Sequence, residues 1–198
     1  MLKKPTSQKL SGAALWALVL LLAVANGLLI RQNLGMRKAL AAYQPQRLEA
    51  GAKVQPFTAA GLSGDPVAVN YGDGGTKKLL FYFTRTCPYC RDQFPRWREI
   101  LERVDGERFE VIGLVDEAED KPRLEEYLRS VGCASDSPKP LRVAFVPKEV
   151  RRNYKLTATP VTLLVSNDGT VEKLWEGRWG DVETTDAGRT LGLDFGGL

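Results

Sequence analysis

The stretch FYFTRTCPYCRDQFPRW, residues 81–97, places Cys87 and Cys90 between an apolar run and a helical pattern. The run before them, Lys78 to Thr84, is short and rich in aromatic residues, which is typical of a buried strand. Pro88 suits the first turn of a helix, because its missing N–H would have no partner there. The sequence therefore predicts a central strand that ends at two cysteines and continues directly as a helix.

The pattern continues along the chain as alternating strands and helices. Asn167-Asp168-Gly169 between two apolar runs predicts a hairpin turn. We expect strands within Phe57 to Val69 and over Lys78 to Thr84, Phe109 to Val115, Leu141 to Phe145, Val161 to Val165 and Val171 to Trp175, and helices over Pro88 to Val104, Pro122 to Val131 and Glu149 to Tyr154. This order predicts a three-layer α/β/α domain with a mixed sheet over residues 51–180, followed by a Gly-rich tail, 181–198.

An uncharged run of nineteen residues, Gly12 to Ile30, lies near the N-terminus. As a helix it would span roughly 28 Å, close to the thickness of a bilayer's hydrocarbon core. Ala23-Val24-Ala25 has the small-x-small form of a signal-peptidase site, so a cleaved signal peptide is the alternative. Because the apolar run continues through Ile30, we expect an uncleaved transmembrane anchor over 12–30, after a short basic tail (1–11) and before a linker (31–50).

The formal net charge of +4 is concentrated in the N-terminal segment. Residues 1–38 carry six basic and no acidic side chains, and the rest of the chain is close to neutral. We therefore expect no nucleic-acid partner. A leader this short more often stays inside while the large domain is exported, which predicts an extracytoplasmic domain.

The chain contains no histidine and three cysteines, Cys87, Cys90 and Cys133. Without histidine there is no Cys-His or Ser-His nucleophile pair and no His-ligated metal site. Three thiols cannot form a four-thiolate zinc site within one chain. We therefore expect neither a metal nor a cofactor.

The predicted position of Cys87, at the start of a helix, favours a reactive thiol. At the start of a helix, Cys87 faces unpaired backbone N–H groups and the positive end of the helix dipole, which favour the thiolate. Arg85 and Arg91 add positive charge and are candidates for lowering the thiol pKa. Cys90, one turn further on, can attack a mixed disulfide formed at Cys87. The alternative is a pair of inert buried thiols or a passive disulfide, but C-x-x-C at a strand-to-helix corner favours redox chemistry.

A second candidate element is Ala158-Thr159-Pro160, directly before a predicted strand. An X–Pro bond held cis at the start of a strand is tolerated in a sheet. In that case the backbone of Thr159 would face the dithiol and could pair with an extended peptide.

These features resemble the membrane-anchored thioredoxin-like oxidoreductases of the TlpA/ResA kind, within the AhpC/TSA superfamily. The anchor, the motif F-x-F-T-R-T-C-P-Y-C, Pro95 eight residues after Cys87, the extra βα unit and A-T-P before the N-D-G hairpin carry the resemblance. Three positions differ: Thr86 replaces the usual Trp, Gln93 replaces a Glu of several reductases, and Phe81 replaces thioredoxin's buried Asp. The resemblance covers roughly residues 50–180.

The resemblance implies that Cys87 is the nucleophile and Cys90 the resolving thiol. It implies that Thr159, Pro160, Pro88 and Tyr89 bind substrate. The implied activity is reduction of disulfides in exported proteins, at the bacterial inner membrane with the domain in the periplasm. Electrons would come from a membrane donor such as a DsbD/CcdA-type protein. A peroxiredoxin-like thiol peroxidase and a non-catalytic peptide-binding scaffold are the alternative functions.

Overall fold

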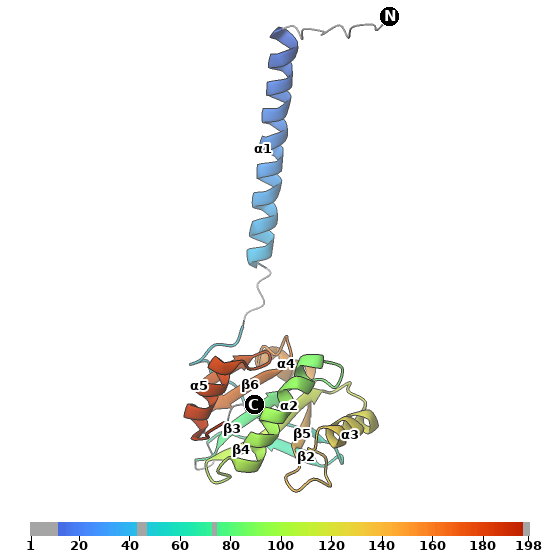
Figure 1. The fold of residues 1–198 in the computed structure, drawn as a ribbon, viewed down its shortest axis with the longest axis vertical. Coiled ribbons are helices and arrows are strands. Elements are labelled where there is room, and N and C mark those ends of the chain that lie inside the picture. Colours follow the sequence, from blue (N-terminus) through green and yellow to red (C-terminus); the bar gives the residue numbers. More distant parts are fainter. Residues whose placement is uncertain (1–11, 43–46, 73–74, 196–198) are drawn as a thin grey trace, which may run out of the picture. The chain divides into compact units, whose positions relative to one another are not determined.

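The computed structural model describes residues 12–42, 47–72 and 75–195, and the chain divides into two units, Met1–Pro45 and Gln46–Leu198. In the first unit the described residues form one helix, α1 (Gly12–Ala42). The second unit contains the remaining described helices and all described strands (Figure 1). The predicted basic tail, residues 1–11, lies outside the described residues.

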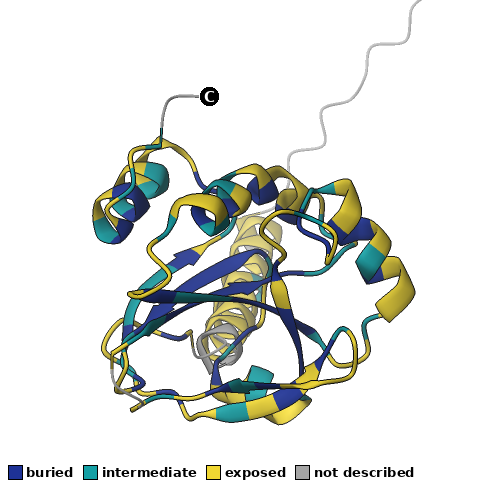
Figure 2. Ribbon diagram, turned by 90° about the horizontal axis from the view of Figure 1, so that it is seen from below, coloured by how far each residue is buried: buried dark blue, intermediate teal, exposed yellow. Residues whose placement is uncertain are grey.

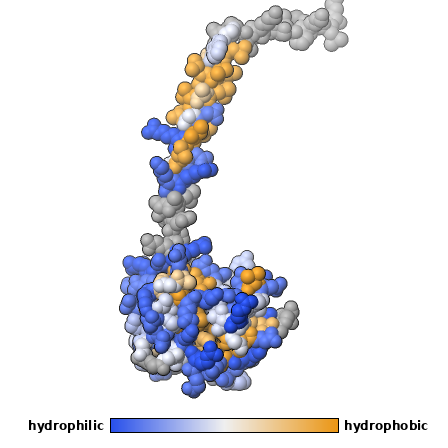
Figure 3. Space-filling view, turned by 90° about the vertical axis from the view of Figure 1, so that its left-hand side faces the viewer, coloured by the Kyte–Doolittle hydropathy of each residue, from blue (hydrophilic) through white to orange (hydrophobic). Residues whose placement is uncertain are grey.

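Helix α1 is apolar over most of its length. Among the described residues it is the one helix long and apolar enough to cross a membrane, over Ala14–Lys38, and Figure 3 shows its hydrophobic side chains in orange. The linker expected from residue 31 begins instead as helix, because α1 continues to Ala42. Residues 31–42 are mostly Arg, Gln, Leu, Met, Lys and Ala, which are good helix formers, so the helix extends beyond the apolar run.

The described residues of the second unit form a mixed sheet of seven strands in the order β2-β1-β5-β4-β3-β6-β7. The three central strands β3, β4 and β5 are parallel, whereas β6 and β7 on one side and β1 and β2 on the other are antiparallel to their neighbours. The strands are β1 (Phe57–Gly61), β2 (Pro66–Val69), β3 (Lys77–Tyr82), β4 (Phe109–Asp116), β5 (Arg142–Val146), β6 (Val161–Val165) and β7 (Val171–Glu176). The predicted strands and the mixed sheet are confirmed.

Helices cover both faces of this sheet, which confirms the three-layer architecture. The helices are α2 (Pro88–Arg103), α3 (Lys121–Ser130), α4 (Lys148–Asn153) and α5 (Asp181–Leu191). Side chains of α2, α3 and α5 share one core with alternate residues of β3, whereas Tyr154, just after α4, and the segment that includes Leu48 and Val54 pack with the other face. Figure 2 shows the buried strands in dark blue between helices whose outer surfaces are exposed.

The C-terminal segment differs from the expectation of a Gly-rich tail. Residues 181–191 form α5, and Ala187, Gly188 and Leu191 are buried. The Glu183 carboxylate accepts the backbone N–H of Gly180 at 2.9 Å, which satisfies one donor at the start of the helix. The buried stripe of α5 is short and consists partly of small residues, so its hydrophobic periodicity is weak in the sequence.

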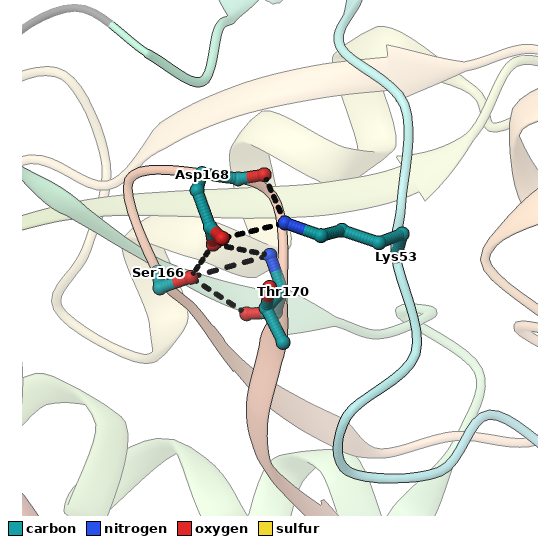
Figure 4. A network of polar contacts seen from close by, with 4 residues as sticks. All are labelled: Lys53, Ser166, Asp168 and Thr170. Atoms are coloured by element: carbon teal, nitrogen blue, oxygen red, sulfur yellow. Dashed lines mark hydrogen bonds and ion pairs between the residues drawn. The ribbon is translucent and has the colours of Figure 1, made fainter.

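The hairpin between β6 and β7 is confirmed, and its turn holds the N-terminal segment of the unit. Gly169 has φ +81°, a conformation that glycine adopts without steric cost. Lys53 forms an ion pair with Asp168, and the Asp168 carboxylate also accepts hydrogen bonds from Ser166 and Thr170 (Figure 4). Backbone hydrogen bonds with Gly169 and Val171 also hold residues 51–54 along the turn and the start of β7.

Candidate active site

The two cysteines of the C-x-x-C motif occupy different environments at the start of α2. Cys87 is the residue just before the first helical position, with extended backbone (φ −85°, ψ 116°), and Pro88 begins the helix. Cys87 is half-buried, whereas Cys90 is completely buried, and both are free thiols. One sulfur can therefore meet a partner molecule while the other lies behind it.

The pairing of β3 with β6 brings the Thr159-Pro160 loop to the dithiol. Tyr82, the last residue of β3, pairs with Val161, the first residue of β6. Residues that follow β3 and residues that precede β6 therefore meet at the same edge of the sheet. The Cys87 thiol donates a hydrogen bond to the carbonyl oxygen of Thr159, with 3.6 Å between sulfur and oxygen. The Thr159–Pro160 bond is cis.

The local environment separates the pKa values of the two thiols. Burial opposes ionisation of Cys87, but hydrogen bonding with the side chain of Thr159, with Cys90 and with the backbone of Tyr89 lowers the pKa of Cys87 overall. Burial raises the pKa of Cys90 to about 12. The reachable sulfur is thus the one that ionises more readily, as a nucleophile requires.

The two flanking arginines lie near the dithiol in different arrangements. The Nε of Arg85 is 2.6 Å from a carboxylate oxygen of Glu119, which neutralises its charge. The guanidinium of Arg91 lies 6.0 Å from the centre of the Tyr127 ring. The main influences on the pKa of Cys87 are burial and hydrogen bonds, so a role for these arginines in tuning the pKa stays a prediction.

The predicted substrate-binding residues near Cys87 differ in their exposure. Pro88 is exposed, and Tyr89 is 61% exposed, which is unusual for a large aromatic side chain. Pro160 is buried and Thr159 is partly exposed. The half-buried thiol thus lies within hydrogen-bond distance of a partly exposed residue, Thr159, and two residues before an exposed aromatic residue, Tyr89.

Residues that the C-x-x-C motif does not indicate hold helix α2 in place. The ring of Phe81 stacks on Trp97 with centroids 4.8 Å apart, and the Trp97 indole N–H donates to the hydroxyl of Thr162 at 2.9 Å. Gln93 is buried, and its side-chain oxygen accepts the backbone N–H of Trp179 at 2.8 Å. The apolar spacing of the helix predicts that Trp97 faces the core. Its hydrogen bond to Thr162 of β6 could not be predicted in the same way, because it depends on which strands pair.

Cys133, the third cysteine, follows α3 and is buried. Burial raises the pKa of this thiol to about 11. Its thiol donates to the carbonyl of Val131 at 3.7 Å. The structure thus places Cys133 in the core, in a less reactive state than Cys87.

A dithiol at the strand-to-helix corner of this mixed sheet, facing a cis-proline loop, defines a thioredoxin-like protein. Residues 50–174 match the model of the AhpC/TSA family. The chain belongs to the AhpC/TSA family, and the family and fold together support an oxidoreductase of the TlpA/ResA type. A comparison with curated proteins finds no match.

Solved structures share the fold at low sequence identity. The thioredoxin domain of a thiol-disulfide oxidoreductase from Bacteroides vulgatus has a TM-score of 0.59 and 17% identity, over 73% of this chain and 99% of that one. A protein assigned as thiol:disulfide interchange protein DsbE from Chlorobium tepidum has a TM-score of 0.58 and 22% identity, over 72% and 94%. StoA from Bacillus subtilis has a TM-score of 0.53 and 15% identity, over 67% and 95%. These likenesses establish the thioredoxin-like fold.

Proposed function

We propose that the chain is a membrane-anchored thiol-disulfide oxidoreductase that reduces disulfides in exported proteins through Cys87 and Cys90. The observation that carries the proposal is the contrast between the two thiols. Cys87 is partly exposed and has a lowered pKa, whereas Cys90 is buried and its pKa is raised to about 12. This contrast suits a nucleophile and a resolving thiol that act in turn.

The exchange proceeds in two steps. The Cys87 thiolate attacks one sulfur of the substrate disulfide, a Cys87–substrate disulfide forms, and the other substrate sulfur leaves as a thiolate. The Cys90 sulfur then attacks Cys87, the proton of Cys90 passes to solvent or to a leaving thiolate, and the second substrate sulfur departs. The substrate gains two electrons and the protein is left with a Cys87–Cys90 disulfide.

Substrate binding would use the surface around Cys87. The backbone of Thr159, a partly exposed residue, would pair with an extended peptide, as in other cases of β-strand addition. The exposed ring of Tyr89, two residues after Cys87, would provide an apolar contact. A peptide held between these groups would bring its disulfide to the Cys87 sulfur.

Helix α1 supports a location at a membrane. Its length and apolar character fit a single transmembrane anchor, with the catalytic domain on the extracytoplasmic side of a bacterial inner membrane. The Cys87–Cys90 disulfide must be reduced after each turnover, and a membrane protein that presents a dithiol at that surface, of the DsbD/CcdA type, would supply the electrons.

The test uses the full-length protein in detergent micelles with a disulfide-containing peptide as substrate. We expect the reduced protein to reduce the peptide, Cys87→Ser to be inactive, and Cys90→Ser to accumulate a mixed disulfide with the peptide. Cys133→Ser is the matched control and should keep full activity. Reduction by Cys87→Ser at the parental rate would contradict the proposal, and rapid consumption of hydrogen peroxide instead of peptide disulfide would favour a peroxidase.

The direction of the reaction is tested by the reduction potential of the Cys87–Cys90 pair. A reductase is expected to have a potential near that of thioredoxin, about −270 mV, whereas a value near about −120 mV, as in DsbA, would indicate an oxidant. Equilibration with glutathione or dithiothreitol buffers, followed by alkylation and mass spectrometry, measures it.

A further inference from the structure

A groove of about 430 Å³ lies beside the dithiol between the start of α2 and helix α3. Its lining contains three arginines, one carboxylate, one tyrosine and one serine: Arg85, Arg91, Arg123, Glu126, Tyr127 and Ser130. Arg85 lies two residues before Cys87, and Arg91 directly follows Cys90. The lining of the groove therefore includes residues on both sides of the C-x-x-C motif. The mechanism proposed above does not use this groove.

The three arginines of the groove differ in how strongly they are paired with acidic neighbours. Arg85 is held by Glu119 at 2.6 Å. Arg123 meets Asp120 only at 3.9 Å, and both side chains are largely exposed, so that ion pair is weak. Arg91 contacts the face of Tyr127. Glu126 supplies one opposing charge, so Arg91 and Arg123 are the two guanidinium groups most available to a further anion.

The tyrosine of the groove lining is packed into the core. Tyr127 is 6% exposed, and its hydroxyl is buried with no hydrogen-bond partner among the described residues. The guanidinium of Arg91 lies over the ring of Tyr127, 6.0 Å from its centre. The ring therefore supports one of the two available guanidinium groups at the groove.

We propose that the groove formed by Arg91, Arg123 and Tyr127 binds a carboxylate that the substrate carries close to its disulfide. Guanidinium groups are suited to this because they donate to a carboxylate through two parallel N–H groups. The preferred clients are thus proteins with an acidic residue beside the cysteine that Cys87 attacks.

This inference rests on the proposed disulfide reduction, and matched peptides separate the two. Each pair of peptides contains one disulfide and differs only by Glu or Gln at one position, with successive pairs moving that position along both sides of the cysteine. The full-length protein in detergent is assayed for kcat/KM. For the best position we expect the Glu peptide to be reduced about tenfold faster than the Gln peptide, the effect of about one charge-assisted hydrogen bond.

Variants of the groove test which groups are responsible. Arg91→Gln and Arg123→Gln should each bring the Glu/Gln ratio toward one. Arg152→Gln removes the same charge from the exposed surface of α4 and should leave the ratio unchanged. Added salt should lower the ratio in the parent protein, since the groove is open to solvent.

Three results would overturn the inference. Equal reduction of the Glu and Gln peptides at every position shows that the groove does not read a carboxylate, while leaving disulfide reduction established. An unchanged Glu/Gln ratio in both arginine variants assigns the preference to another surface. If no peptide is reduced at all, the proposed function itself fails, and the docking site with it.

Discussion

The sulfur of Cys87 lies 3.6 Å from the carbonyl oxygen of Thr159 and donates a hydrogen bond to it. A thiolate has no proton to donate, so ionisation of Cys87 frees this carbonyl. An extended peptide bound beside the cis-proline loop could then use the same oxygen as a backbone acceptor. Ionisation of Cys87 and the availability of the Thr159 carbonyl are thus linked.

The first prediction concerns the pH dependence of alkylation. The thiolate is the form that reacts, so a lowered pKa shifts the midpoint of the rate–pH profile to lower pH. Because the pKa of Cys87 is lowered, we expect Cys87 to reach half its maximal rate with iodoacetamide at a lower pH than a free peptide cysteine. Mass spectrometry of the alkylated full-length protein at successive pH values measures the profile.

The other two cysteines serve as internal controls for this experiment. Burial raises the pKa of Cys90 to about 12 and that of Cys133 to about 11. Both should therefore remain unmodified at neutral pH, so that one alkyl group is found per chain. Equal labelling of Cys87 and Cys90 would show that the difference between the thiols is absent in solution.

The second prediction concerns the hydrogen bond beneath the site. Thr162→Val keeps the shape of the side chain but leaves the buried indole N–H of Trp97 without its acceptor. We expect the free energy of unfolding to fall by about 1–3 kcal/mol, as for other unsatisfied buried donors. Urea unfolding followed by tryptophan fluorescence measures it, and Thr157→Val, at an exposed position, should change stability by less than about 0.5 kcal/mol.

The fold was predictable from the sequence because the local strand, helix and turn patterns agree with a three-layer α/β/α architecture. The turn at Asn167-Asp168-Gly169 and the apolar run before Cys87 each have one strongly favoured structure. The position of Cys87 at the start of a helix followed from Pro88. The contact between Cys87 and Thr159 could be anticipated from the proline before β6, but the register of β3 with β6 was needed to establish it.

Other features depend on contacts between distant segments. The ion pair of Arg85 with Glu119 forms because β3 and β4 are parallel neighbours and both side chains follow the ends of those strands. Sequence spacing does not show this neutralisation.

Helix α5 was missed because Gly188 is a poor helix former in isolation. In the structure a side chain at Gly188 would meet the carbonyl of Leu193 at 2.7 Å, so packing requires glycine there.

The third prediction tests whether α5 belongs to the core of the domain. Leu191 is 3% exposed and Val182, on the same helix, is 78% exposed. We expect Leu191→Ala to lower the free energy of unfolding by about 2–4 kcal/mol, because it removes buried apolar volume. Val182→Ala should change it by less than about 0.5 kcal/mol. Equal effects of the two substitutions would mean that α5 does not pack as described.

The fourth prediction compares two glycines that both have positive φ. A side chain at Gly64 (φ +92°) would meet no atom within 4 Å, whereas one at Gly169 (φ +81°) would lie 2.9 Å from the carbonyl oxygen of Val54. Gly64→Ala therefore carries only the backbone cost, about 1 kcal/mol. Gly169→Ala adds a clash with the segment that Lys53 fixes against the hairpin, so we expect about 3 kcal/mol in total. Chemical unfolding of both variants measures the difference. If Gly169→Ala were no more destabilising than Gly64→Ala, residues 51–54 would not be held against the hairpin turn.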